Sequence, residues 1–154
     1  MMKRLACLLL FLATAAFAQR PDGPPPPERG PEKCSLATLT GDYLFAQDGL
    51  EGGKPFAQAG KESYDGAGHV KGVSTSSTNG TIKRGTYTAT YTMKADCTGT
   101  LTITDSAKKT YHYDVFTTPG GNEAVWVQTD YGSVSAGWER RRMGPPPGMG
   151  RPPQ

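Results

Sequence analysis

The strongest constraint on the fold of this chain is an alternation of apolar and polar residues with a period of two. It is clearest in residues 86–93, where Tyr87, Ala89, Tyr91 and Met93 alternate with threonines. Such alternation is typical of a strand that has one face on a core and the other toward water. The sequence therefore predicts an all-β protein, and the one exception we expect is a short helical turn near the first of the folded residues.

The alternation also predicts which side chains face the core. In their segments, Tyr111, Tyr113 and Trp138 take the apolar register. Phe116 and Trp126 fall on the opposite register from their neighbours. We interpret these two residues as marking a bulge, a sheet edge or an exposed contact patch.

Turn signals divide the chain into about eight strands. Asn79-Gly80 and Asp65-Gly66 are examples, since these pairs supply the positive φ angles that tight hairpins need. Short successive hairpins favour an antiparallel up-and-down sheet, and closure into a β-barrel removes the exposed edges. A β-sandwich is the alternative. The predicted strands are 42–47, 55–64, 69–76, 80–94, 99–104, 110–117, 123–129 and 133–141.

The N-terminus has the features of an export signal. Lys3 and Arg4 precede an uncharged apolar run, which ends in the small-x-small sequence Ala16-Phe17-Ala18. This order predicts a signal peptide over residues 1–18, because the run is shorter than the roughly 20 residues of a membrane span. An uncleaved anchor is the alternative. No later segment is apolar enough to cross a membrane, so we expect a secreted or periplasmic protein.

The charge of the chain excludes one class of partner. Removal of Lys3 and Arg4 with the signal reduces the formal net charge from +3 to +1. Such a chain lacks the basic field that nucleic-acid binding requires. The run Arg140–Arg142 is interpreted as a solvated strand end, with contact to an anionic surface as the alternative.

Two proline-rich arms flank the predicted barrel. Residues 19–33 and 143–154 hold eleven of the thirteen prolines. Proline removes backbone donors, and neither arm has enough large apolar side chains to form a core. We expect both arms to be disordered spacers around a β-barrel domain at 34–142.

Cys34 and Cys97 remain after removal of the signal, which takes Cys7 with it. In an oxidising compartment an isolated pair is most simply a disulfide. Two free thiols or metal ligands are the alternatives, although two cysteines without a histidine cluster make a poor zinc site.

The sequence contains little evidence of a catalytic, metal-binding or phosphate-binding site. The only histidines, His69 and His112, are interpreted as surface residues. The sequence has no nucleophile elbow, no metal-ligand spacing and no phosphate-binding glycine loop. We therefore assign no catalytic residue, no metal and no cofactor.

The aromatic side chains offer a second kind of site. Aromatic residues in strands usually fill a core, but in a barrel they can also line a pocket for an apolar ligand. The candidates for such a lining share the apolar register of their strands. They are Tyr87, Tyr91, Tyr111, Tyr113 and Trp138.

Several segments occur in an order that resembles a family of small secreted bacterial proteins. They are the Cys34-Ser-Leu-Ala-Thr-Leu-Thr-Gly-Asp-Tyr start, the Tyr64-Asp-Gly-Ala-Gly turn, Gly85-Thr-Tyr-Thr and Asp96-Cys-Thr-Gly-Thr-Leu-Thr. The family resembles calycin-type barrels, comparable to lipocalins or to the barrel of allene oxide cyclase. The resemblance implies export, a calycin-like fold and the cysteine pairing, and it transfers no catalytic residue.

Three functional hypotheses follow. The first is a secreted barrel that binds a small apolar ligand. The second is a structural or interaction protein of the cell envelope, with the proline-rich arms as spacers. The third is a cyclase or isomerase, which needs a polar group inside the barrel, for which Glu62, Glu123 and His112 are the candidates.

Overall fold

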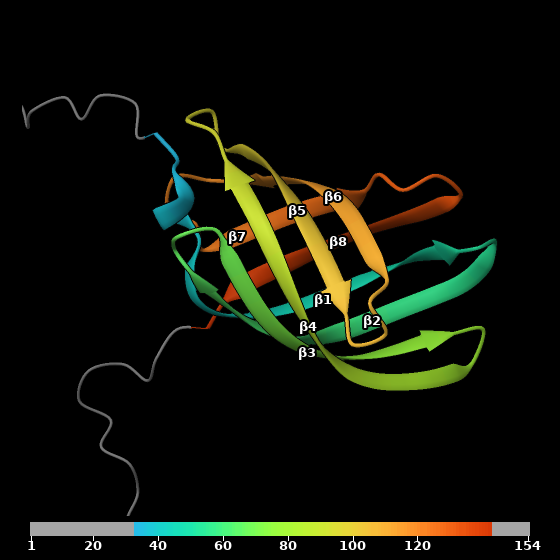
Figure 1. The fold of residues 1–154 in the computed structure, drawn as a ribbon. Coiled ribbons are helices and arrows are strands. Elements are labelled where there is room, and N and C mark those ends of the chain that lie inside the picture. The colour runs from blue at the N-terminus through green and yellow to red at the C-terminus, as the bar shows by residue number, and fades with distance from the viewer. Residues whose placement is uncertain (1–32, 143–154) are drawn as a thin grey trace, which may run out of the picture. The chain divides into compact units, whose positions relative to one another are not determined.

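Eight strands follow one another in chain order and close into an antiparallel up-and-down barrel (Figure 1). The computed structural model describes residues 33–142. The predicted barrel is confirmed, whereas the signal peptide and the proline-rich arms lie outside the described residues. The elements are η1 (Leu36–Thr38), β1 (Thr40–Glu51), β2 (Lys54–Asp65), β3 (His69–Thr78), β4 (Thr81–Met93), β5 (Thr98–Asp105), β6 (Thr110–Thr117), β7 (Glu123–Gln128) and β8 (Ser133–Arg141).

The hairpins form where the turn residues predict them. Asn79 and Gly80 both have positive φ, at 49° and 84°, in the β3–β4 turn. Asp65 uses a carboxylate oxygen to accept from the backbone N–H groups of Ala67 and His69. Such side-chain-to-backbone bonds stabilise a tight turn through contacts within the turn itself.

One end of the barrel is closed by a plug of side chains, which we call the closed end. The short helix η1 lies there, and Leu39 behind it is 1% exposed. Tyr91 donates from its hydroxyl to the carbonyl oxygens of Leu36 (2.8 Å) and Leu39 (2.9 Å). The predicted disulfide between Cys34 and Cys97 is present and joins the residues before η1 to the β4–β5 turn. None of the helices in the described range is long and apolar enough to cross a membrane.

Aromatic rings form the centre of this plug. The Tyr64 ring packs edge-on against Tyr43 and against Tyr91, with both centroid distances at 5.1 Å. The hydroxyl of Tyr43 donates to the carbonyl of Gly121 in the β6–β7 turn (2.6 Å). The closed end is therefore held by ring packing and by hydrogen bonds that cross it.

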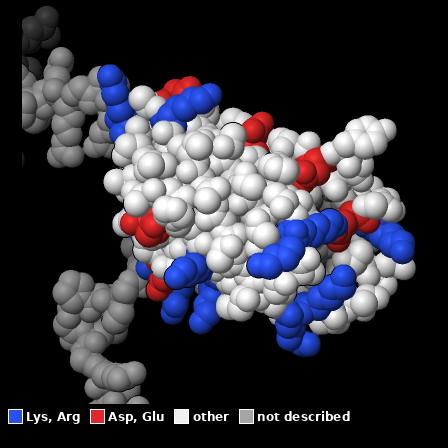
Figure 2. All heavy atoms as spheres, in the orientation of Figure 1, with Lys and Arg blue, Asp and Glu red and all other residues white. Residues whose placement is uncertain are grey.

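The outer face of β4 and β5 carries the threonines predicted for the solvent side. Thr88, Thr90 and Thr92 lie opposite Thr104, Thr102 and Thr100 in the ladder. Figure 2 shows a broad uncharged area on one face, with basic side chains gathered below it and to its right.

The predicted orientation of two tryptophans is wrong. Trp138 lies on the outer face of β8 and is 52% exposed, whereas Trp126 lies inside the barrel and is 6% exposed. The inner register of β8 contains Ser135, Gly137 and Glu139 instead. Gly137 explains the difference, because a Cβ atom there would come within 2.7 Å of the Trp126 ring. The ring of Trp126 thus fills the space that a side chain from β8 would need.

Candidate functional site

The half of the barrel away from η1 encloses a cavity of about 380 Å³. This volume lies at the lower end of the range for small-molecule sites. Six aromatic side chains line it: Phe45, Phe56, Tyr87, Tyr111, Tyr113 and Trp126. Its polar lining includes Gln47, Gln58, Glu62, Ser74, Ser76 and Gln128. The cavity therefore combines apolar walls with a small set of hydrogen-bonding groups.

The cavity opens to solvent beside the β3–β4 and β5–β6 hairpins. The β4–β5 ladder ends at the pair Tyr87 and Asp105, while β4 continues past it from Thr81 to Thr86. Lys83 and Thr86 on this overhang line the cavity and are exposed. The overhang arises because β5 turns early, where Asp105 accepts from the N–H groups of two residues in its own turn. The cavity is therefore bordered by exposed residues of β4 where β5 no longer pairs with it.

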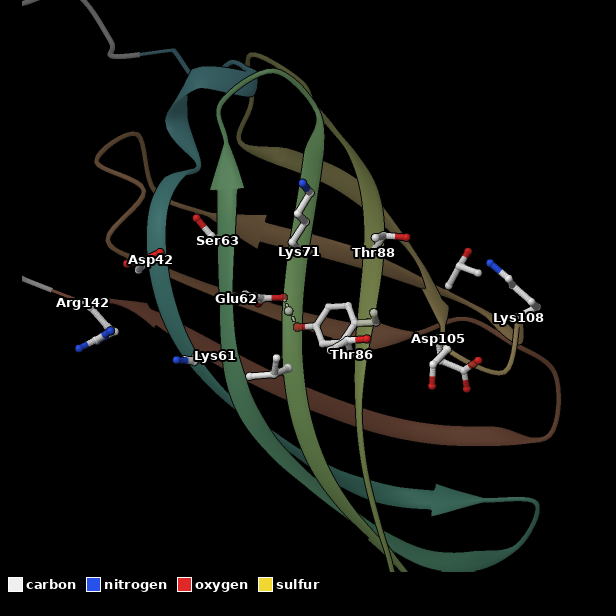
Figure 3. Close-up of a pocket in the computed structure, with 15 residues that line it drawn as sticks. Asp42, Lys61, Glu62, Ser63, Lys71, Thr86, Thr88, Asp105, Lys108 and Arg142 are labelled. Carbon is white, nitrogen blue, oxygen red and sulfur yellow. Dashed lines mark hydrogen bonds between the residues drawn. The ribbon is translucent and has the colours of Figure 1, made fainter.

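A glycine on β3 allows two residues from separate strands to meet inside the barrel. Gly72 pairs with Glu62 of β2 on one side and with Tyr87 of β4 on the other. A Cβ atom at Gly72 would lie 2.1 Å from the Tyr87 ring. The ring instead crosses Gly72, and its hydroxyl donates to Glu62 Oε2 at 2.6 Å (Figure 3). Glycine in a strand often marks such a close approach.

A second glycine has the same effect on the opposite wall. Trp126 passes over Gly137 and donates from Nε1 to Oε1 of Gln47 (3.0 Å). Gln47 donates in turn to Gln58 (2.7 Å), and Gln58 donates to the hydroxyl of Ser74 (2.7 Å). This chain of bonds orders the polar side chains from β7 to β3, so the polar groups of the cavity are held in place before any ligand arrives.

Two buried carboxyl groups lie next to each other between the cavity and the plug. Glu62 is 5% exposed and Glu139 on β8 is 1% exposed. Tyr64 donates to Glu139 Oε1 at 3.2 Å, but Oε2 of Glu139 has no hydrogen-bonding partner within the described residues. Glu62 and Glu139 are hydrogen-bonding neighbours of each other, which requires that one of the two carboxyl groups carries a proton.

The environment of this pair favours its protonated forms. Burial raises the pKa of Glu62. Burial, and then the charge of Glu62, holds the pKa of Glu139 well above its usual range. Both effects follow because an ionised carboxylate loses hydration inside the barrel and two neighbouring negative charges repel. Burial also raises the pKa of Tyr113, to about 12, so this hydroxyl stays neutral.

The candidate lining residues are distributed over three environments. Tyr87, Tyr111 and Tyr113 lie on the cavity wall. Tyr91 points inward but belongs to the plug, where its hydroxyl bonds the backbone beside η1. Trp138 lies outside, as described above.

Of the three candidates for a polar group inside the barrel, only Glu62 lies there. Glu123 is exposed and pairs with Arg140 at 2.8 Å. His112 is exposed and contacts the carboxylate of Asp130 at 2.7 Å. Both were wrong as lumenal candidates, because alternate residues of β6 and β7 face opposite sides of the wall. Within the described range, no group of three or more potential ligands is arranged to hold a metal ion.

Sequence reasoning missed Glu139, Gln47 and Gln58. The sequence does contain one indication of them, which is the pair of small residues before Glu139. Ser135 and Gly137 leave room inside the barrel for side chains from neighbouring strands. Small inward residues on one strand indicate large inward residues nearby. That signal cannot be used until the strand order and register are known.

A larger hollow, of about 540 Å³, lies on the outer surface of β2, β3 and β4. Four basic residues line it: Lys61, Lys71, Lys108 and Arg142. Figure 3 shows Lys108 and Arg142 on opposite sides of this hollow, with Lys71 pointing away from both. Because these cations are exposed and do not converge, we place the candidate site in the lumen.

Comparison with known proteins supports the fold. No protein-family model matches the chain, and no curated protein matches it. Among solved structures it is similar to a de novo designed fluorescence-activating β-barrel, with 8% sequence identity and a TM-score of 0.53. The match covers 70% of this chain and 96% of the designed chain. At this identity the similarity concerns the fold alone.

Proposed function

We propose that this chain is an exported binding protein that takes up a small, largely apolar ligand in the lumen of its barrel. The observation that carries the proposal is the solvent-connected cavity with six aromatic side chains on its walls. A filled barrel of this size would have interdigitated side chains there, as the closed end does. The chain therefore lacks, at this end, the side-chain packing that would stabilise a filled barrel.

The hydrogen-bonded lining supports the same function. Gln47 and Gln58 are held by neighbours, so little side-chain entropy is lost when a ligand binds against them. The similarity to a designed fluorescence-activating barrel is consistent with a lumen that holds a small molecule.

Export is part of the proposal. The predicted signal peptide, the calycin-like resemblance and the disulfide all agree with a secreted or periplasmic location. In such a location a ligand would be bound outside the cytoplasm, with the proline-rich arms as spacers. The mass of the mature protein purified from its native host tests this, since cleavage after Ala18 and loss of two hydrogens in the disulfide are both visible.

Binding can be tested with a neutral, environment-sensitive naphthalene dye and the mature chain. We expect saturable binding of one dye per barrel, with increased dye emission. Ser76→Trp, which places a large ring in the cavity, should weaken binding at least about tenfold, or 1.4 kcal/mol. Ser77→Trp on the next residue of β3 is the matched control, because its side chain lies on the opposite face.

A further variant, Trp138→Ser, distinguishes dye binding in the lumen from dye binding on the outer surface. Trp138, Val125 and Phe116 are neighbours on the outer face, with exposures of 52%, 53% and 46%, and they could adsorb an apolar dye. Dye binding that survives Ser76→Trp but is lost in Trp138→Ser would contradict the proposal. That result would favour the hypothesis of an interaction protein.

A further inference from the structure

Glu62 differs from every other charged residue that lines the cavity. Lys83 and Arg84 are exposed, and Glu51 and Asp105 are half-buried near the hairpins. Glu51 is also paired with Lys109 at 2.7 Å. Glu62 alone is buried, at 5% exposure, and it accepts one hydrogen bond of ordinary geometry, from Tyr87. A carboxylate has about four acceptor positions, so Glu62 has capacity beyond the Tyr87 hydroxyl and the neighbouring Glu139 carboxyl group.

No positively charged residue contributes to the pKa of either carboxyl group, although Glu62 also borders the outer hollow with its four basic residues. Glu62 lies beside Tyr43 of β1, and Glu139 lies beside Phe45 of β1 and Ala124 of β7. Tyr64 and Tyr87 contribute one hydroxyl donor each. No lysine, arginine or histidine is buried in the described part of the chain.

Arg141 follows Glu139 by two residues on β8 and contacts Tyr43, which pairs with Glu62. Its guanidinium is already committed, donating to the Tyr43 hydroxyl at 3.0 Å and to the Thr38 carbonyl at 2.8 Å. Isolated carboxyl groups inside a protein are costly without donors or a cation. The free Oε2 of Glu139 is the visible sign of this deficit.

We infer that the lumenal ligand is an amine: an apolar, preferably aromatic body that ends in a protonated nitrogen, which donates to Glu62 at the floor of the cavity. This inference rests on the proposed function and names the ligand class. An ammonium group brings three donors and the missing positive charge. The aromatic wall suits the same ligand, because tyrosine and tryptophan faces attract cations. An anionic ligand would instead add a further negative charge beside two carboxyl groups.

Three ligands with one ring system test the inference by calorimetry on the mature chain at pH 7.5. They are 2-naphthylmethylammonium, 2-naphthylmethanol and 2-naphthoate. We expect the ammonium compound to bind at least about tenfold more tightly than the alcohol, and the carboxylate to bind most weakly. Glu62→Gln should weaken ammonium binding about tenfold and change alcohol binding less than twofold. Glu123→Gln, on the outer surface, should change neither.

The outcomes separate the two proposals. Equal affinity for the ammonium and the alcohol overturns the amine inference and leaves lumenal binding standing. A preference for the ammonium that survives Glu62→Gln also overturns it, since the cation would then lie elsewhere. If none of the three compounds binds, the proposed function itself fails.

A measurement on the unmodified protein keeps the test decisive should Glu62→Gln not fold. As the pH falls from 7.5 toward 4, the negative charge on the carboxyl pair is lost, because burial raises the pKa of each group. The groups that face them from β1, β2 and β4 are tyrosines, which stay neutral throughout. The excess affinity for the ammonium over the alcohol should therefore decline with pH, and a constant ratio would contradict the inference.

Discussion

The two ends of this barrel are built from the same strands but differ in how their interiors are used. At the closed end, Leu39 and the edge-to-face rings of Tyr43, Tyr64 and Tyr91 are packed together, and none of these residues is more than 5% exposed. At the other end, which we call the open end, the lining is aromatic and polar and surrounds a cavity of about 380 Å³. If the open end binds a ligand as we propose, stability and binding are separated along the barrel axis. A substitution at the closed end should then change stability and leave ligand affinity largely unchanged, and a substitution at the open end should do the reverse.

The largest expected effect is the loss of a plug residue. Leu39→Ala should lower the free energy of unfolding by about 3 kcal/mol, because it empties a fully buried position. Phe56→Ala at the open end removes a larger but half-buried side chain beside an existing cavity, and should cost about 1 kcal/mol. Urea unfolding of both variants gives the two values. Equal losses would remove the energetic distinction between the ends.

The disulfide offers a test of the closed end alone. Replacement of Cys34 and Cys97 by serine should cost about 2 to 4 kcal/mol, since the bridge closes a long loop in the unfolded chain. Under conditions where the double variant is still folded, affinity for the neutral naphthalene dye should change less than twofold. A large loss of dye binding would show that the cavity depends on the bridge and that the ends are coupled.

The fold was largely predictable because its determinants are local. Alternation in residues 86–93 sets which side chains face inward, and Asn79-Gly80 sets a turn whatever the rest of the chain does. Each hairpin joins neighbours in sequence, so strand order follows once the hairpins are assigned. These features need no knowledge of contacts between distant residues.

The site was less predictable because it depends on closure of the barrel. Glu139 meets Glu62 only after β8 pairs with β1, and no property of either segment alone indicates the contact. The reversed tryptophans have the same cause, since apolar Trp138 satisfies a period-two pattern equally well on either face. What decides the face is Gly137, whose missing side chain makes space for Trp126.

The buried carboxyl pair, at the boundary between the two ends, predicts a pH dependence of stability. The pKa values of Glu62 and Glu139 are raised on folding, so the native state binds more protons than the unfolded state above about pH 4.5. Their contribution is complete below the unfolded pKa and is lost as the pH rises through the folded pKa. Stability should therefore decline as the pH rises above about 4.5.

Glu139→Gln tests this directly, because glutamine keeps an oxygen for the Tyr64 hydroxyl and cannot ionise. We expect the variant to be more stable than the parent by about 1 kcal/mol at pH 8 and to show a flatter pH profile. Glu123→Gln on the outer surface is the control and should follow the parent curve. A parent whose stability rises between pH 5 and 8 would contradict the raised pKa values.

The smallest expected effect on stability concerns the outer wall. Trp138→Ser should change the free energy of unfolding by less than about 0.5 kcal/mol, because the ring is 52% exposed and fills no interior space. The tryptophan fluorescence of this variant is more informative, because it reports on Trp126 alone. Trp126 packs against Phe45 at a centroid distance of 6.1 Å and is 6% exposed. The variant should show blue-shifted emission that iodide quenches poorly, and the lumenal amine should still alter it, since Trp126 lines the cavity. Efficient quenching by iodide would mean that Trp126 faces the solvent and that β7 has its opposite face inward. The residues assigned to the cavity lining on β7 would then be wrong.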